Sequence, residues 1–163
     1  MDISEVLIRE EIRYTISRYL TAVDRSAYNE LVDVFTPDAL VVFGGLPPLE
    51  GCQAIISAMT LGAERRGALL PNNFSRHTLG HSIVNVLSDT TARSVHYIMM
   101  ISEIGLDHSG VYIDDFVKSG DRWLIAQRSA NLEWVHPNSR YATPGNPPPV
   151  PTAKSKLDLE FTR

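Results

Sequence analysis

The chain has 163 residues, 44% of them hydrophobic and 21% charged, which is ordinary for one soluble globular domain with a substantial core. Its net charge of −4 argues against a nucleic-acid binder, which needs an excess of Lys and Arg. The single cysteine, Cys52, excludes an internal disulfide and a cysteine-based zinc site. No apolar run could span a bilayer and no signal-peptide pattern opens the chain, so we expect a cytoplasmic protein without membrane partners.

The first third of the chain predicts mainly helices. Over residues 4–23 apolar side chains recur at helical spacing, which predicts an amphipathic helix. A short second helix is expected over residues 26–35, because Ser26 can cap its start. A buried strand over 40–43, a turn over 44–48 and a third helix over 51–61 follow.

From residue 75 the pattern changes to the alternation of polar and apolar residues that is typical of strands. Turn residues over 88–91 and 119–121 separate the segments and predict an antiparallel meander. The expected strands cover residues 75–87, 92–103, 110–118 and 122–134. Helices followed by a meander make an α+β domain.

The domain is expected to end near residue 136. Residues 137–163 are rich in Pro, Gly and Asn, which predicts an extended tail over the surface or onto a neighbouring subunit. The sequence therefore divides into a domain of residues 1–136 and a tail of residues 137–163.

Two histidines lie on the strand that begins at Ser75. Alternation places His77, Leu79, His81 and Ile83 on one face of it. A two-residue turn at 89–90 would put Ser102 opposite His77, Ile98 opposite His81 and His96 opposite Ile83. Since Ile98 and Met100 are apolar, this common face is expected to point to the interior.

A histidine in such a place has two interpretations. It is either a neutral core residue with both ring nitrogens satisfied, or a general base that a carboxylate orients. The two histidines lie roughly 13 Å apart along a strand, so they cannot share one metal ion and we expect no metal site. His108 falls in an expected loop and is predicted to be exposed.

Asp24 is the carboxylate that could serve His77. It ends the apolar stripe of the first helix, five residues after Tyr19. An isolated aspartate is more often a solvated acid, and a tyrosine is more often a core residue than a catalyst. A buried tyrosine hydroxyl would still need a hydrogen-bond partner.

Several short stretches carry a family resemblance through their order and spacing: Ala22–Ser26, Leu31–Phe43, Arg76–Gly80, Ser88–Ala92 and Gly120–Ile125. Together they resemble the SnoaL-like branch of the nuclear-transport-factor-2-like superfamily, close to the scytalone dehydratase and hexachlorocyclohexane dehydrochlorinase group. The resemblance covers roughly residues 5–134.

This resemblance implies a cone-shaped, curved antiparallel sheet wrapped around the N-terminal helices, with a cavity inside. It also implies that Asp24 and His77 form a catalytic dyad, and related bile-acid dehydratases carry a functional tyrosine that matches Tyr19. The residues expected to line the cavity and contact substrate are Phe43, His81, Ile98, Met100, Ser102 and Ser109.

The chain departs from scytalone dehydratase at several positions of that enzyme's site. Val23 and Phe43 stand where it has tyrosines, Ser102 falls near its second catalytic histidine, and Val111 replaces an asparagine. Scytalone itself is therefore not the expected substrate, and a more apolar pocket favours a small hydrophobic ring compound.

Two functions remain open from the sequence. The first is a cofactor-free lyase or isomerase that uses His77 as base, Asp24 as its orienting carboxylate and Tyr19 as a hydrogen-bond donor. The second is a non-catalytic small-molecule-binding module or accessory subunit. Contact between Asp24 and His77 in an open pocket would favour the first.

A homo-oligomer, dimer or trimer, is expected, because Arg93, Val95, Tyr97, Met99 and Ile101 form a largely apolar stripe on the outer sheet face.

Overall fold

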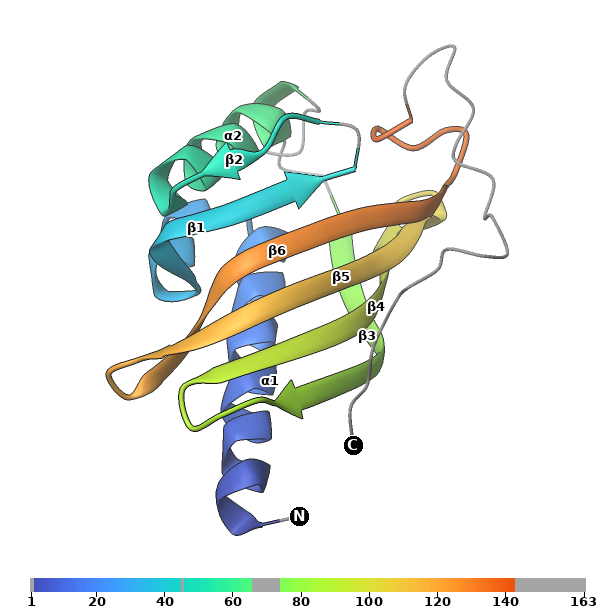
Figure 1. Ribbon diagram of the computed structural model, residues 1–163. Helices are drawn as coiled ribbons and strands as arrows, with labels where there is room; N and C mark the ends of the chain where they lie inside the picture. The colour runs from blue at the N-terminus through green and yellow to red at the C-terminus, as the bar shows by residue number, and fades with distance from the viewer. Residues whose placement is uncertain (1, 45, 66–73, 143–163) are drawn as a thin grey trace.

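Three helical segments and a short strand pair precede a long meander in the computed structural model, which describes residues 2–44, 46–65 and 74–142 (Figure 1). Within these residues the helices are α1 (Ile3–Asp24), the 3-10 helix η1 (Tyr28–Asp33) and α2 (Cys52–Arg65). The strands are β1 (Phe35–Phe43), β2 (Leu49–Glu50), β3 (Ser75–Val86), β4 (Thr91–Ser102), β5 (Gly105–Ser119) and β6 (Arg122–Val135).

The strands described form one mixed sheet in the order β2-β1-β6-β5-β4-β3. The predicted meander of β3 to β6 is antiparallel throughout, as expected. β1 adds to it by pairing parallel with β6, with Val41 opposite Arg128. The predicted α+β class is thus confirmed, and the sheet is mixed where a purely antiparallel one was expected.

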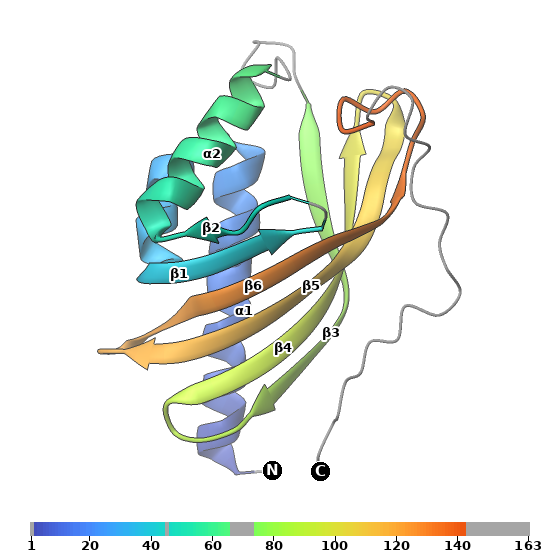
Figure 2. The same ribbon diagram turned by 45° about the horizontal axis from the view of Figure 1, so that its top comes forward.

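Helix α1 packs against one face of the curved sheet, and α2 covers the end formed by β1 and β2 (Figures 1 and 2). Asp2 caps α1 by accepting a hydrogen bond from the backbone N–H of Ile3 at 2.6 Å. The apolar stripe of α1 meets large side chains of the sheet in one core. The core side chains include Ile12, Ile16, Phe35, Phe116, Trp123 and Ile125, each at most 1% exposed.

The register of β3 against β4 differs from the predicted register at two points. After the turn that follows β3, the pairing of β4 with β3 is shifted by one residue from the predicted register, so that Ile83 lies opposite Val95 instead of His96. A β-bulge between Leu79 and Ser82 then shifts the pairing by one more residue, and His77 lies opposite Met100. Because two single-residue shifts cancel in their effect on side-chain direction, His77 still faces the interior.

Residues 137–142, the start of the predicted tail, form turns instead of extended chain, with Ser139 buried. The rest of that tail, residues 143–163, lies outside the described residues, as does Gly45 of the predicted turn over 44–48, so these expectations stay predictions. No helix among the described residues is both long enough and apolar enough to cross a membrane.

Candidate active site

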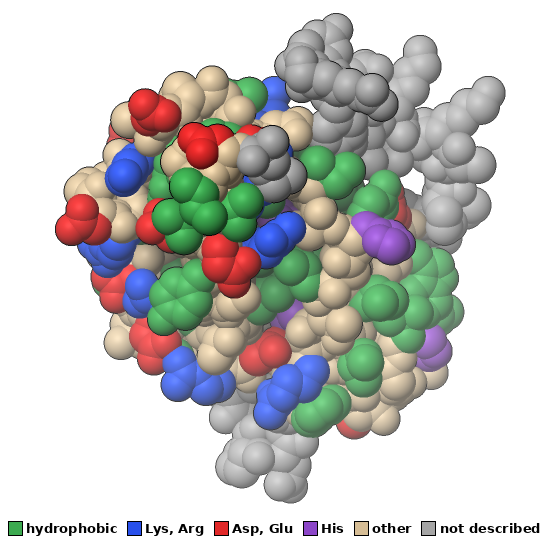
Figure 3. Space-filling model, turned by 90° about the horizontal axis from the view of Figure 1, so that it is seen from below, with side chains coloured by type: hydrophobic (Ala, Val, Ile, Leu, Met, Phe, Trp, Pro, Cys, Tyr) green, Lys and Arg blue, Asp and Glu red, His purple; other side chains and the backbone are tan. Residues whose placement is uncertain are grey.

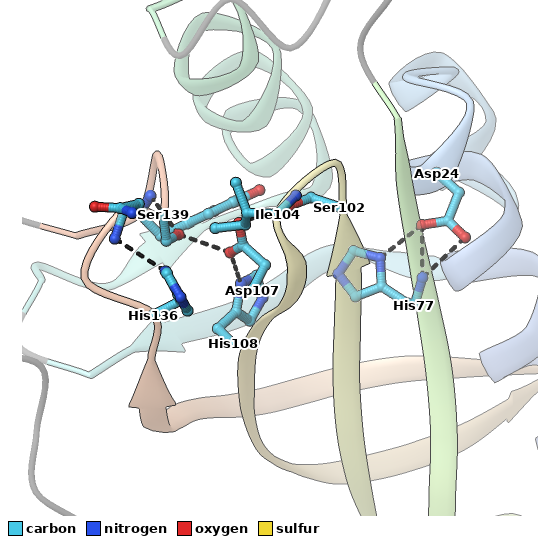
Figure 4. A network of polar contacts seen from close by, with 10 residues as sticks. Asp24, His77, Ser102, Ile104, Asp107, His108, His136 and Ser139 are labelled. Carbon is cyan, nitrogen blue, oxygen red and sulfur yellow. Dashed lines mark hydrogen bonds and ion pairs between the residues drawn. The ribbon is translucent and has the colours of Figure 1, made fainter.

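Asp24 and His77 contact each other where the end of α1 meets the start of β3 (Figure 4). The Nδ1 atom of His77 lies 2.6 Å from Oδ1 of Asp24, and the backbone N–H of His77 donates to both carboxylate oxygens at 3.1 Å. The two side chains are only 6% and 11% exposed. Since an ionised carboxylate only accepts hydrogen bonds, Nδ1 carries the proton and Nε2 is left with a lone pair.

His77 lines a pocket of about 550 Å³, a figure that includes its open mouth. Figure 4 shows the second ring nitrogen of His77 on the side away from Asp24, toward Ser102 and Asp107. The pocket has apolar and polar walls. Its apolar lining comes from Val23, Phe74, Met100 and Ile104, and its polar lining includes Ser26, Ser75, Ser102, Asp107 and Asn138.

A second histidine–aspartate pair, Asp107 and His108, lies across this pocket. Oδ1 of Asp107 accepts from Nδ1 of His108 at 2.8 Å and from the Ser139 hydroxyl at 2.6 Å. Its Oδ2 accepts from the Ser102 hydroxyl at 3.1 Å. The prediction that His108 is an exposed loop residue is wrong, because β5 begins at Gly105 and His108 is only 3% exposed.

A β-bulge explains how two consecutive residues both turn inward. The β4–β5 pairing shifts between Met100 and Ile101, which leaves Asp107 as an extra residue between Leu106 and His108. Regular alternation would place Asp107 and His108 on opposite faces. The bulge lets the carboxylate reach the neighbouring ring.

His77 and His108 flank Met100 in one row across β3, β4 and β5. Their ring centroids lie 6.1 Å apart at an interplanar angle of 70°, and His108 also contacts Tyr141 at 4.6 Å. The sheet thus brings two imidazoles, each held by its own aspartate, close together, and of the two it is His77 that lines the pocket.

The turn after β6 forms one wall of the pocket and is tied to Asp107. The backbone N–H of His136 donates to the Asp107 carbonyl at 2.7 Å, in addition to the Ser139 contact. Arg140 bridges to Glu103 at 2.6 Å across the same wall. These contacts place Asn138, Arg140 and Tyr141 on the pocket.

Tyr19 belongs to a different cluster, centred on Arg128. This arginine is fully buried and makes two hydrogen bonds of 2.7 Å to Asp114, while the rings of Tyr19 and Tyr112 lie 4.0 and 4.4 Å from its guanidinium carbon. Burial raises the pKa of Tyr19 above its ordinary value. Tyr19 is therefore not among the side chains that line the pocket at His77.

His96 completes the buried polar interior beside Arg128. Its ring nitrogens contact the hydroxyls of Ser82 at 2.5 Å and Ser94 at 2.6 Å, and Nε2 lies 4.0 Å from Asp114. Burial lowers the pKa of His96 to about 4, although Asp114 acts in the opposite direction. At neutral pH this histidine is uncharged. It is therefore a neutral core histidine with both ring nitrogens hydrogen-bonded, which is one of the two interpretations that the sequence left open for an inward-facing histidine.

The remaining predicted substrate contacts divide between the two faces of the sheet. Met100 and Ser102 line the pocket with His77, as expected. His81 is exposed because of the β3 bulge, and Ser109 lies on the outer face opposite Met99, so neither residue lines this pocket and a substrate contact by either one stays a prediction. Phe43 and Ile98 face the core instead of this pocket.

Comparison with known proteins gives the family. Residues 4–129 match the model of the SnoaL-like domain, and an uncharacterized protein of Mycobacterium tuberculosis is 30% identical over 139 residues, covering 78% of this chain and 87% of its own. The chain therefore belongs to the SnoaL-like family. The family assignment made from the sequence is confirmed.

Solved structures agree on the fold. A candidate scytalone dehydratase from Novosphingobium aromaticivorans superposes with a TM-score of 0.75 at 17% identity, covering 94% of this chain and all of its own. A hexachlorocyclohexane dehydrochlorinase of the LinA-type3 class from Novosphingobium barchaimii superposes with a TM-score of 0.67 at 14% identity, covering 83% and 93% of the two chains. Dehydratases and dehydrochlorinases thus share the fold.

Sequence reasoning missed one part of this site and the buried ion pair behind it. The Asp107–His108 pair gave no signal, because the bulge that turns both residues inward breaks the alternation on which the prediction depended. The Arg128–Asp114 pair did carry a signal. Both residues lie on inward-facing positions of apolar strands, and an arginine in such a place needs a buried acid.

Proposed function

We propose that the chain is a cofactor-free lyase or isomerase that acts on a small hydrophobic ring compound, with His77 as the general base and Asp24 as the carboxylate that orients it. The observation that carries this proposal is the 2.6 Å contact between Nδ1 of His77 and Asp24. It leaves Nε2 as the basic atom on the pocket side of the ring.

The reaction proposed needs only this pair. Nε2 of His77 removes a proton from a carbon next to a carbonyl, and Asp24 stabilises the imidazolium that forms. For elimination, the carbon–carbon double bond forms as the bond to the leaving oxygen breaks. The imidazolium then returns its proton to that oxygen, which departs as water and leaves His77 neutral. No electrons are gained or lost, so the step needs no redox partner.

The burial of the pair supports a catalytic over a structural role. With side chains 6% and 11% exposed, His77 and Asp24 interact in surroundings of low dielectric, where charge stabilisation is stronger than in water. The proposal gives Tyr19 an indirect part. Its ring packs 4.0 Å from the Arg128 guanidinium, so it supports that buried cation instead of touching substrate at His77.

A non-catalytic binding module is the rival interpretation. Such a module could use the same pocket without any base, whereas the paired groups at its wall are what proton transfer requires. Dehydratases and a dehydrochlorinase among proteins of this fold also favour catalysis.

The test is an activity screen of purified wild type, His77→Ala and His81→Ala against cyclic ketones with a leaving group β to the carbonyl. His81 is the matched control because it lies on the same strand but is exposed. We expect His77→Ala to lose about 10²- to 10⁴-fold in rate, and His81→Ala to keep the wild-type rate. Equal losses in both variants, or none in either, would contradict the proposal.

A further inference from the structure

The wall of the pocket opposite Asp24 is rich in hydrogen-bond acceptors. Asp107 lines it with a carboxylate that is buried, and Ser102 lines it with a hydroxyl whose proton is directed to Oδ2 of Asp107 at 3.1 Å. The Ser102 hydroxyl donates its proton in this contact and accepts the backbone N–H of Ile104 at 3.4 Å, so one acceptor position of its oxygen is left for a ligand.

Asp107 is held as an acceptor by the groups around it. His108 and the Ser139 hydroxyl both donate to Oδ1, at 2.8 and 2.6 Å, whereas among the described residues only the Ser102 hydroxyl donates to Oδ2. An ionised carboxylate has about four acceptor positions, so Oδ2 keeps capacity for one further donor. A buried carboxylate gains most from such a donor, since charge-assisted hydrogen bonds are about twice as strong as neutral ones.

We propose that Ser102 and Asp107 form a subsite that binds a hydroxyl group of the substrate, and that this hydroxyl is the group eliminated. This inference rests on the proposed function of His77. The hydroxyl donates its own hydrogen to the subsite, and its oxygen lone pair faces His77, whose imidazolium supplies the proton that completes water. The substrate class is therefore a ring ketone with a β-hydroxyl.

The same geometry discriminates against a halogen at that position. A chlorine substituent of similar size has no hydrogen to donate, so the remaining acceptor position of the buried Asp107 carboxylate would gain no hydrogen bond from the substrate. We therefore assign the chain to dehydration and not to dehydrochlorination, although both chemistries occur among proteins of this fold.

The binding test uses two non-reacting probes, 4-hydroxycyclohexanone and 4-chlorocyclohexanone, titrated into the labelled full chain and followed by NMR. We expect wild type to bind the hydroxy ketone about 10-fold or more tightly than the chloro ketone. Ser102→Ala and Asp107→Asn should each reduce that preference several-fold. Ser109→Ala is the matched control, because Ser109 is on the outer sheet face opposite Met99. Amide spectra of each variant establish whether it is folded. Two subsite variants are used, so that the test still stands if one of them does not fold.

Equal affinity of wild type for the two probes, or no binding of either at millimolar concentration, would overturn the subsite. So would an unchanged preference in a folded Ser102→Ala and a folded Asp107→Asn.

A kinetic comparison separates this inference from the proposed function. 3-Hydroxycyclohexanone and 3-chlorocyclohexanone give the same enone, whose absorbance reports both eliminations against the uncatalysed background. We expect a larger rate enhancement for the hydroxy ketone, lost in His77→Ala. If His77→Ala abolishes an enhancement that is equal for both compounds, the subsite is wrong and the base remains. If the enhancement survives in His77→Ala, the proposed function itself fails.

Discussion

At the residue scale, Asp24 occupies a place that is unfavourable for a carboxylate. It is the last residue of α1, where the partial negative charge of a helix end disfavours a second negative charge. Hydrogen bonds from the backbone N–H and the ring of His77 offset that cost. Because the Asp24 carboxylate is stabilised mainly by His77, it in turn stabilises the positive charge that His77 gains when it takes a proton.

Arg128 shows how much charge the interior of this small domain holds. Its pair with Asp114 is completely buried, and burial, which would lower the pKa of the guanidinium, is outweighed by Asp114, so that the pKa is raised. Nη1 of Arg128 has no hydrogen-bond partner among the described residues. The flanking rings of Tyr19 and Tyr112 stabilise the cation through their faces.

The titration of His96 predicts an acid-sensitive fold. An unfolded chain takes up a proton on this residue near pH 6.5, whereas the folded state does so only near pH 4. Its contribution to stability is therefore complete above pH 6.5 and is lost as the pH falls from 6.5 to 4. The loss should reach roughly 3 kcal/mol.

Urea unfolding of wild type and His96→Gln at several pH values measures this contribution. Glutamine can hydrogen-bond to Ser82 and Ser94 but does not titrate, so the slope of stability between pH 4 and 6.5 should be smaller in the variant. Parallel pH profiles for the two proteins would show that His96 is not the responsible group.

At the element scale, departures from regular strands decide which residues form the site. The bulge at Leu79–Ser82 exposes His81, and the bulge beside Met100 turns Asp107 and His108 inward together. A third irregularity between Ser109 and Gly110 brings β5 very close to β6. Bulges of this kind re-aim side chains and bend the sheet.

Gly110 is required by this close approach. A Cβ atom added there would lie 2.2 Å from the Asn131 carbonyl oxygen, and backbone of β6 cannot move aside without separating the strands. Gly110→Ala should lower the free energy of unfolding by about 1–3 kcal/mol or more. Gly80→Ala is the control, because its Cβ would meet Tyr97 at an ordinary 3.4 Å. Urea midpoints that fall equally in both variants would contradict this account.

These irregularities also mark the limit of prediction from the sequence. Helix α1 and the four long strands were predictable because their apolar periodicity extends over many residues. The contact of Asp24 with His77 was implied by the resemblance to the family and is confirmed. The Asp107–His108 pair was not predictable, since a bulge arises from backbone pairing between strands and leaves no periodic trace in either strand.

At the scale of the whole molecule, the outer face of the sheet is unusually apolar. Tyr97, Met99 and Ile101 on β4 are each 42–43% exposed, and Ile83 and Leu106 on the neighbouring strands add to them. Val95 is buried, so the predicted stripe is shorter than expected, and Arg93 pairs with Asp115 at its end. In the view of Figure 3, charged side chains cover one side of the molecule and hydrophobic ones gather toward the other.

We predict that this outer face joins copies of the chain into a dimer or trimer. Light scattering at micromolar concentration should give a multiple of the 18.1 kDa chain mass. Met99→Lys should shift the mass toward the monomer. Tyr14→Lys should not, because Tyr14 is an exposed aromatic residue on α1, away from this face. A monomer mass for wild type would refute self-association.

The proposal that His77 and Asp24 act as one unit is tested most directly by a double-mutant cycle of elimination rates. Wild type, His77→Ala, Asp24→Asn and the double variant are compared on the cyclic ketone that wild type turns over best, with circular dichroism to establish that each is folded. If Asp24 acts only through His77, Asp24→Asn should slow wild type by at least 10-fold, and should cost nothing further once His77 is alanine. Losses that add in the double variant, or full activity in Asp24→Asn, would contradict the dyad.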